Sequence, residues 1–372
     1  MNKFNDFNLS PSILECLKNS AYHTPTPIQN LSIPLLLKEN DLLGIAQTGT
    51  GKTAAFSLPL IDKFLKNKIK VKPARIRSLI VTPTRELASQ IEANIKKYSK
   101  GQNLKTKTIF GGVGKQPQVM ALSRGVDILI ATPGRLLDLT NEGHVIYEQL
   151  EVFILDEADR MLEFGFLKDI KKIISMLPKK RQTLLFSATM PKDIRELSKS
   201  ILKNPETVEV TPESTTVEKI KQTAKHIPNA EKINELAKIV KSDKVISVLV
   251  FTRTKYGADK IVKKLSRKSI EAVAIHGNKS QGARERALEN FRSKKVKVLI
   301  ATDIAARGID VPHISHVVNY NIPDDPKSYV HRIGRTARAG SQGCAISLYD
   351  DTEIGKLKDI EKIIKQKIPR IK

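Results

Sequence analysis

The chain has 372 residues, of which 40% are hydrophobic and 5% aromatic, and it carries a formal net charge of +25. The length fits two domains of common size, and the composition is typical of a soluble α/β protein, which excludes an intrinsically disordered chain. No apolar run approaches the roughly 20 residues that a membrane span needs, and the N-terminus lacks a secretory signal pattern. We therefore expect a cytoplasmic protein with no membrane-bound part.

The excess of positive charge favours a polyanionic partner, and nucleic acid is the usual one. Part of the lysine excess can equally be compositional bias, and a run such as residues 63–77 can be a solvated surface. The charge does not distinguish RNA from DNA. Cys16 and Cys344, the only cysteines, lie far apart without metal-like spacing, and we expect both to be small core residues in a reducing cytosol.

Short apolar runs recur along the chain, and each stops at a polar cluster. In the first half they are "DLLGIA" before a glycine-rich loop, "SLIV" before "TPTREL", "DILIA" before "TPGR", "VFIL" before "DEAD" and "TLLF" before "SAT". After residue 240 they are "VISVLVF" before "TRT", "VKVLIA" before "TDIAARG" and "SHVVNY" before "NIPDD". Apolar strands alternating with helical stretches predict parallel sheets covered on both faces, which bind ligands at the carboxyl ends of the strands.

The stretch 202–220 has two prolines, several threonines and no long apolar run, so it predicts a linker. We expect a first domain over residues 1–209, a linker over 210–217, and a second domain over 218–372 that ends in a short basic tail. The two halves share a plan of strands and motifs without a literal repeat. The C-terminal "EKIIKQKIPRIK" predicts a basic terminal helix.

The segment "AQTGTGKT", residues 46–53, contains the phosphate-loop pattern G-x-x-x-x-G-K-[ST] with alanine at its first glycine position. Glycines let successive N–H groups point into one concavity, and the helix that follows adds its positive dipole end. Lys52 would reach the outer phosphates, and the hydroxyl of Thr53 would be a Mg²⁺ ligand. A strand before the loop and a helix after it are the context that the pattern requires, so we predict a nucleotide site.

A second Mg²⁺ ligand is expected from "DEAD", at the end of the strand "VFIL". Asp156 would hold the metal through water, because Mg²⁺ keeps much of its hydration shell. Glu157 would orient and deprotonate the attacking water, which predicts hydrolysis of the nucleotide and not binding alone. Taken by itself, the tetrapeptide could equally be a charged surface turn.

The ordered set of motifs resembles that of the DEAD-box RNA helicases. "AQTGTGKT", "PTRELA", "TPGR", "DEAD", "SAT", "ARGID" and "HRIGRTARAG" occur in the order and spacing of that family, over nearly the whole chain. "FNLSPSIL", "FGGVGKQPQ" and "EADRMLEFGF" are most similar to the bacterial RhlE-type subgroup. The resemblance implies an α/β protein of two tandem RecA-like domains, each a mostly parallel sheet covered by helices on both faces, with ATP and Mg²⁺ as ligands.

The resemblance also implies which residues of the first half touch the nucleotide. Gln29 would read the adenine edge, because a side-chain amide can both donate and accept there. Phe4 would pack on the base, although a phenylalanine near an N-terminus is more often a core residue. Ala21 stands where the family usually has glycine. The loop residues expected to bind ATP are Thr48, Gly49, Thr50, Gly51, Lys52 and Thr53.

The second half would complete the catalytic site. The resemblance implies that Arg335 and Arg338 are arginine fingers, whose guanidinium groups meet the charge on the transferred phosphoryl group. His331 would organise their motif, Asp310 would approach the ribose, and Gly308 would give the backbone room. Ala337 replaces a frequent glycine in this motif.

Ser187 and Thr189 of "SAT" resemble the element that connects ATP hydrolysis to strand separation, through bonds with Asp159. Small hydroxyls after a strand also make ordinary turns. Hydrolysis would take place in the cleft between the two domains, since the metal ligands lie in one half and the fingers in the other.

The implied RNA contacts lie in loops, where glycine N–H groups, hydroxyls and arginines bind phosphates and sugars without reading bases. They predict little sequence preference, strong salt dependence and, through 2′-hydroxyls, a preference for RNA. No aromatic-rich surface is visible to add stacking. The expected contacts are Arg85, Gly111, Gly112, Thr132 and Arg135 in the first half and Arg253, Gly277, Arg284 and Thr302 in the second.

We therefore expect a monomeric ATP-dependent RNA helicase that locally unwinds short duplexes or remodels RNA–protein complexes. Ribosomal precursors and RNA-degradation assemblies are its possible partners. One alternative is an ATP-regulated RNA clamp with slow turnover, and a second is a DNA helicase.

Overall fold

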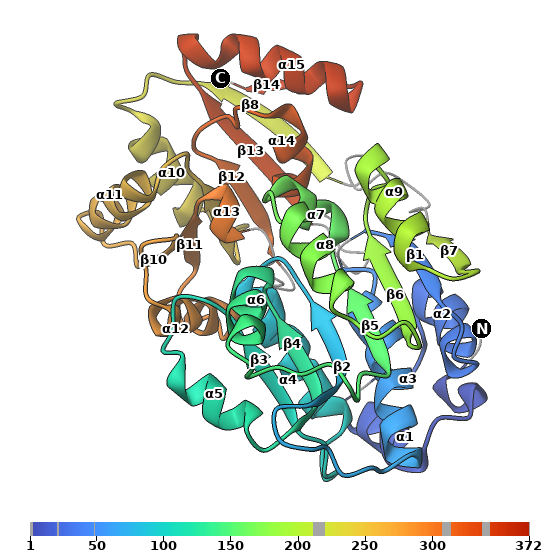
Figure 1. Ribbon diagram of the computed structural model, residues 1–372. Helices are drawn as coiled ribbons and strands as arrows, with labels where there is room; N and C mark the ends of the chain where they lie inside the picture. The colour runs from blue at the N-terminus through green and yellow to red at the C-terminus, as the bar shows by residue number, and fades with distance from the viewer. Residues whose placement is uncertain are drawn as a thin grey trace. The chain divides into compact units, whose positions relative to one another are not determined.

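The computed structural model describes residues 3–20, 22–47, 49–210, 220–306, 314–336 and 343–371 (Figure 1). The chain divides into two compact units, Met1–Thr211 and Pro212–Lys372. The expected linker, 210–217, falls almost wholly outside the described residues. Within the described ranges, no helix is both long and apolar enough to cross a membrane.

The first unit is a seven-stranded parallel sheet in the order β3-β4-β2-β5-β6-β1-β7. Its strands are β1 Leu42–Ala46, β2 Ile76–Val81, β3 Thr106–Ile109, β4 Val126–Ala131, β5 Val152–Leu155, β6 Gln182–Ser187 and β7 Glu206–Val210. Its helices are η1 Phe4–Phe7, α1 Pro11–Asn19, α2 Pro27–Leu37, α3 Lys52–Lys66, α4 Arg85–Tyr98, α5 Gln116–Leu122, α6 Pro133–Asn141, α7 Ala158–Glu163, α8 Leu167–Ser175 and α9 Lys192–Ile201.

Successive residues of the central strands pack into two different hydrophobic cores. Ile80 and Ile154 pack with residues of α1–α4, whereas the preceding residues, Leu79 and Phe153, pack with residues of α6, α8 and α9. Side chains alternate across a strand, so a strand covered on both faces is favoured to be apolar at successive positions. This is why β5 is apolar throughout, and why β2 and β4 end in the apolar runs "LIV" and "ILIA" after buried polar residues near their starts.

The second unit repeats the plan with the strand order β10-β11-β9-β12-β13-β8-β14, again all parallel. Its strands are β8 Ile220–His226, β9 Val248–Phe251, β10 Ala272–Ile275, β11 Val298–Ala301, β12 His316–Asn319, β13 Gly343–Tyr349 and β14 Arg370–Ile371. Its helices are α10 Lys232–Lys241, α11 Lys255–Ser266, α12 Gln281–Arg292, α13 Asp303–Ala306, α14 Pro326–Ile333, η2 Asp351–Glu353 and α15 Ile354–Ile364. Two helix-covered parallel sheets confirm the expected fold class.

Two edge segments differ from what their sequence stretches predict. Residues 206–210, in the stretch 202–220 that predicts a linker, form β7 and pair with β1, and of these only Val210 belongs to the expected linker 210–217. The C-terminal segment is helical only to Ile364, and Arg370–Ile371 then pairs with β8. Both are edge strands with few buried side chains, so neither has the apolar run by which a central strand is recognised.

The C-terminal helix α15 is part of the core. Ile360 is fully buried, whereas Ile363 on the same helix is 46% exposed. We expect Ile360→Ala to lower the free energy of unfolding by about 2–5 kcal/mol, because it leaves a cavity. Ile363→Ala should change it by less than about 0.5 kcal/mol. Chemical denaturation of the two variants measures the difference, and equal stability would show that α15 is not anchored through Ile360.

Candidate functional site

The glycine-rich loop joins the end of β1 to the start of α3. Gly49 and Gly51 have φ angles of +89° and +99°, a region that residues with a side chain rarely adopt. The loop thereby turns into the N-terminus of a 15-residue helix, whose dipole favours negative charge at that end. The loop residue Thr48 lies outside the described residues.

Gln29 is buried and connects α2 to this loop. Its Nε2 donates to the carbonyl oxygen of Gly51 at 3.0 Å, and its Oε1 accepts from the N–H of Thr26 at 3.0 Å. A Cβ on Gly51 would lie 2.4 Å from that Nε2, and its φ of +99° is one that residues with a side chain rarely adopt, so glycine is strongly favoured here. Phe4 is 3% exposed and packs against Phe7, with 6.0 Å between ring centroids, and its packing on a base stays a prediction. In this structure Phe4 is a core residue.

Lys52 and Asp156 form the buried charged centre of the first unit. Lys52 donates from Nζ to the carbonyl oxygen of Ala46 at 2.9 Å. Burial raises the pKa of Asp156 to about 7, although the charge of Lys52 partly opposes this rise. Asp156 Oδ1 is buried and has no hydrogen-bond partner among the described residues. A buried carboxylate oxygen without a partner is costly, and a bound cation would remove the cost.

This donor set fits Mg²⁺. The described residues contain no cluster of three or more His, Cys, Asp or Glu side chains that could hold a metal alone. Asp156 and Thr53 would therefore share the ion with water and with the phosphates of a nucleotide, which is how Mg²⁺ is usually bound. When bound, the ion would neutralise charge that develops on the phosphates.

Glu157 is buried and has φ of +55°, an uncommon value for a residue with a side chain. Backbone strain of this kind is often found at functional sites. Its carboxylate forms an ion pair with Arg160 in the first turn of α7. The sequence reasoning did not identify Arg160, because nothing in its spacing distinguishes it from a surface arginine.

The third acid of "DEAD", Asp159, is bonded to the "SAT" segment after β6. Thr189 donates to Asp159 Oδ2 from its N–H at 2.8 Å and from its hydroxyl at 2.9 Å. The Ser187 hydroxyl accepts from the Asp159 N–H at 3.3 Å and donates to the Thr189 carbonyl at 2.7 Å. The expected bonds between the two motifs are therefore present.

The expected RNA contacts of the first unit converge around one loop. The Arg85 guanidinium packs so close to Gly112 that a Cβ there would lie 2.2 Å from Nη1. Arg135, in the first turn of α6, reaches the carbonyl oxygen of Val113 at 3.4 Å. Gly111 lies in the same loop, and Thr132 is the N-cap residue of α6. Arginines from two separate motifs thus hold the glycine loop.

In the second unit the expected contacts follow neighbouring strands. Gly277 follows β10, Thr302 follows β11 and Arg253 follows β9, and these three strands are adjacent in the sheet. Arg253 lies 3.4 Å from Glu353 Oε1 and 3.7 Å from Asp324 Oδ2. Arg284 is buried in the first turns of α12.

The segment expected to carry the arginine fingers is described only in part. Arg335 is buried and donates from Nε to the carbonyl oxygen of His331 at 3.3 Å. Gly308, Asp310 and Arg338 lie outside the described residues, as does Ala337.

Arg332, which the sequence reasoning missed, is the buried centre of a polar network in the second unit. It donates to both carboxylate oxygens of Asp303, at 2.6 and 2.7 Å. It also donates to Asn319 Oδ1 at 3.1 Å and to the carbonyl oxygen of Asn321 at 2.7 Å. This network joins the "TDIAARG" and "HRIGR" segments.

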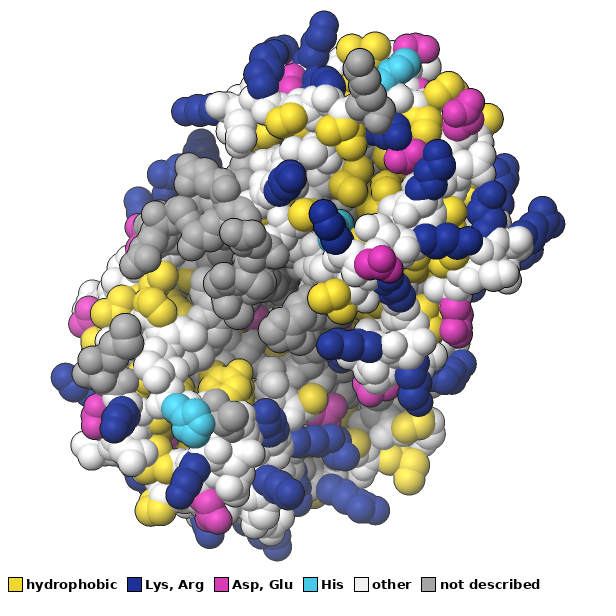
Figure 2. Space-filling view, turned by 180° about the vertical axis from the view of Figure 1, so that it is seen from behind, with side chains coloured by type: hydrophobic (Ala, Val, Ile, Leu, Met, Phe, Trp, Pro, Cys, Tyr) yellow, Lys and Arg dark blue, Asp and Glu magenta, His cyan; other side chains and the backbone are white. Residues whose placement is uncertain are grey.

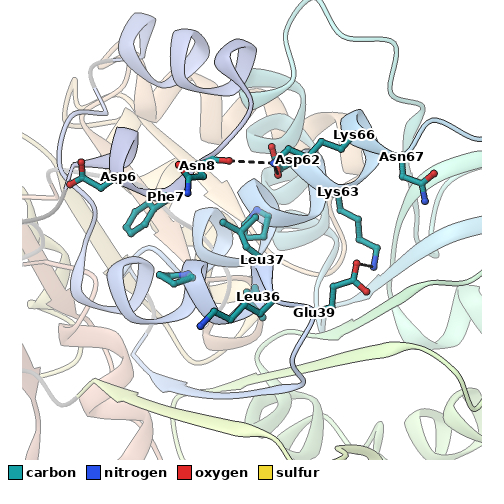
Figure 3. Close-up of a pocket in the computed structure, with 13 residues that line it drawn as sticks. Asp6, Phe7, Asn8, Leu36, Leu37, Glu39, Asp62, Lys63, Lys66 and Asn67 are labelled. Atoms are coloured by element: carbon teal, nitrogen blue, oxygen red, sulfur yellow. Dashed lines mark hydrogen bonds and ion pairs between the residues drawn. The ribbon is translucent and has the colours of Figure 1, made fainter.

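A cavity of about 500 Å³ lies at the other end of α3 from Lys52, between η1, α2 and α3 (Figure 3). Four of its charged side chains pair with one another, Lys63 with Glu39 at 2.8 Å and Lys66 with Asp62 at 2.7 Å, and its lining also includes one further acid and one further lysine, Asp6 and Lys38. These pairs leave it without the concentrated positive charge that a polyphosphate requires.

Comparison with known proteins identifies the family. The DEAD/DEAH box helicase model matches residues 26–197, and the helicase conserved C-terminal domain model matches residues 231–340. The DEAD-box ATP-dependent RNA helicase CshA of Geobacillus kaustophilus is 39% identical over 372 residues, which cover all of this chain and 79% of that protein. The chain belongs to the DEAD-box helicase family. CshA of Streptococcus pneumoniae is 41% identical over 370 residues, covering 100% of this chain and 70% of that protein.

Solved structures of DEAD-box proteins have the same fold. Saccharomyces cerevisiae Dbp5 bound to RNA and ADP BeF3 matches with a TM-score of 0.86 at 31% identity, covering 100% of this chain and 96% of that one. A DEAD box protein from Methanococcus jannaschii matches with a TM-score of 0.57 at 40% identity, covering 100% and 99%. The two units are thus the tandem RecA-like domains of this DEAD-box helicase.

One face of this DEAD-box protein carries many positively charged side chains (Figure 2). On the face drawn in Figure 2, Lys and Arg side chains are spread over the surface and are not gathered into one patch. Such a distribution attracts a polyanion without fixing its position, which leaves positioning to specific loops.

Proposed function

We propose that this protein is an ATP-dependent RNA helicase that unwinds short duplexes locally or remodels RNA–protein complexes. The observation that carries the proposal is the arrangement of the three acids of "DEAD" at the end of β5. Asp156 has a buried oxygen without a partner, Glu157 is paired with Arg160, and Asp159 is bonded to Thr189. A helicase driven by ATP needs three groups close together, namely a metal ligand, a general base and a connection to a second motif.

Hydrolysis would draw on residues of both units. In the first unit Lys52 would bind the outer phosphates, and Glu157 would take a proton from the attacking water. In the second unit Arg335 and Arg338 would stabilise the transferred phosphoryl group. Neither unit alone would then hydrolyse ATP well, and a step that brings the two sets of residues to one nucleotide would act as the switch.

RNA would bind mainly through its sugar-phosphate backbone. The loop around Gly112 and the strand ends that carry Arg253 and Gly277 offer backbone N–H groups and guanidinium groups, which recognise phosphate. If ATP and RNA both favour one arrangement of the units, each raises the affinity for the other. The relatives reported above are named CshA, so the RhlE-type subgroup is not confirmed. Ribosomal-precursor or degradation assemblies, a monomeric state and a cytoplasmic location stay predictions.

The test of this function is steady-state ATP hydrolysis without nucleic acid, with single-stranded RNA, and with DNA of matched sequence. We expect strong stimulation by RNA alone. Equal stimulation by DNA would favour the DNA helicase. Tight ATP-dependent RNA binding without stimulated hydrolysis would favour the clamp.

The bond between Asp159 and Thr189 predicts a separation of two activities. Thr189→Val keeps the shape of the side chain but removes a hydrogen bond to a carboxylate, worth about 1.5–3 kcal/mol. We expect duplex unwinding to fall roughly 10- to 100-fold while RNA-stimulated hydrolysis stays within a few-fold of wild type. Thr183→Val, at a buried position of β6, is the matched control. A parallel loss of both activities would show that Thr189 serves hydrolysis itself.

A further inference from the structure

The first turn of α11 carries the most exposed of the large apolar side chains in the described part of the chain. Tyr256 is 72% exposed, and a tyrosine left in water at such a position gives no packing to the fold. We propose that Tyr256 is a stacking platform for one nucleobase of bound RNA. The proposal rests on the proposed RNA-binding function and adds a contact that recognises a base ring.

The position of Tyr256 places it among the expected RNA contacts. The helix α11 begins at Lys255, directly after the segment that carries Arg253 and four residues after the end of β9. Since β10, β11 and β9 are adjacent parallel strands, their carboxyl ends share one edge of the sheet. A strand of RNA bound by its phosphates at this edge would therefore pass close to the tyrosine.

Hydrogen bonds join the start of α11, next to Tyr256, to its neighbours. The Thr254 hydroxyl accepts from the N–H of Gly257 at 3.0 Å and so caps the helix. Lys255 Nζ lies 5.2 Å from the centroid of the Tyr256 ring and donates to Asn278 Oδ1 at 3.0 Å. This bond fixes the helix start to the turn of Gly277.

A second connection supports the same turn. Asp259, one helical turn beyond Lys255, lies 2.9 Å from Lys279 Nζ and 3.2 Å from His276 Nε2. Both partners flank Gly277, whose Cβ position has no neighbouring atom within 4 Å. The turn is thus held on both sides and is open in the middle, where a backbone phosphate could approach.

The side chains around Tyr256 favour a nucleobase over a protein surface as the binding partner. Among the described residues of the second unit, the other exposed large apolar side chains are Ile246, Ile354, Ile363 and Ile371, and none lies in α11. A protein partner usually covers a contiguous apolar patch, which is missing here. One exposed ring with lysine and arginine beside it is typical of single-strand binding, where base stacking contributes about 1–3 kcal/mol per base.

Equilibrium binding of short single-stranded RNA, with a non-hydrolysable ATP analogue present, tests the proposal. A set of RNAs of one length, each with one base removed at a different position, is compared with the intact RNA. We expect Tyr256→Ala to weaken binding of intact RNA roughly 5- to 150-fold, which corresponds to the stacking range. Tyr256→Phe keeps the ring and should bind within about twofold of wild type.

The base-removal series identifies the contact by a double-mutant cycle. At one position, removing the base should weaken wild type but leave Tyr256→Ala unchanged. Ile246→Ala, at an exposed side chain before β9, is the control and should bind all RNAs as wild type does. If wild type and Tyr256→Ala bind intact RNA equally, the stacking contact is overturned, but the proposed RNA-binding function is not. Failure of the wild type to bind any of these RNAs would overturn the proposed RNA function.

Discussion

Glu157→Gln is expected to lower RNA-stimulated ATP hydrolysis by about 10²–10⁴-fold, which is the usual contribution of a general base. An amide has the shape of the carboxylate but cannot accept the proton of the attacking water. Nucleotide binding should persist, because Lys52 and the phosphate loop are unchanged. Phosphate release with saturating RNA measures the first effect, and titration with a fluorescent ATP analogue measures the second.

The matched control for this change is Glu163→Gln, at the exposed last residue of α7. It alters the same helix by the same chemistry and should hydrolyse ATP as wild type does. Undiminished hydrolysis by Glu157→Gln would assign the base to another residue. Loss of ATP binding together with hydrolysis would instead give Glu157 a structural role through its ion pair with Arg160.

Arg332→Met should destabilise the second unit by about 3 kcal/mol. Removing one partner of a buried ion pair costs about 3–5 kcal/mol, and the lower end applies because Asp303 is 30% exposed and water can partly replace the lost contact. Asn319 and Asn321 would each lose a donor as well. Thermal and chemical denaturation of the full chain measure the change.

The double variant Arg332→Met with Asp303→Ala separates the ion pair from the packing of the arginine. It should be more stable than Arg332→Met alone, because no carboxylate is left without its partner. Arg267→Met, at an exposed position after α11, should be neutral. If Arg332→Met were equally neutral, the network around Arg332 would contribute nothing to stability.

The central strands could be predicted from the sequence because they are buried on both faces. The outer strands β3, β7, β10 and β14 were not predicted, and neither were β8 and β13 inside the second sheet. Most of these strands are very short or have partly exposed side chains at alternate positions. At the site, the bonds of Asp159 were implied by the family resemblance of the two motifs that it joins. Arg332 and Asp303 are 29 residues apart, and only the folded sheet brings them together. Pairing of this kind leaves no periodic signal in the sequence.

The exposure of Tyr256 was equally invisible in the sequence. A tyrosine at the start of an amphipathic helix can face either the core or the solvent, and the choice depends on where the helix rests on the sheet. The aromatic neighbours of Phe4 were invisible in the sequence for the same reason, and its expected packing on the adenine stays a prediction.

The contact between Gln29 and Gly51 has a consequence for which fragments of a nucleotide can bind. The amide expected to read the base is bonded to the backbone of the loop expected to hold the phosphates. A ligand that rearranges the loop therefore also moves the amide, and a ligand that moves the amide also rearranges the loop. Adenosine, added alone, would contact the amide without the phosphates that bind the loop. Inorganic triphosphate, added alone, would contact the loop without the base that binds the amide. The sum of the two binding free energies should therefore differ from the binding free energy of ATP, because only ATP contacts the amide and the loop together.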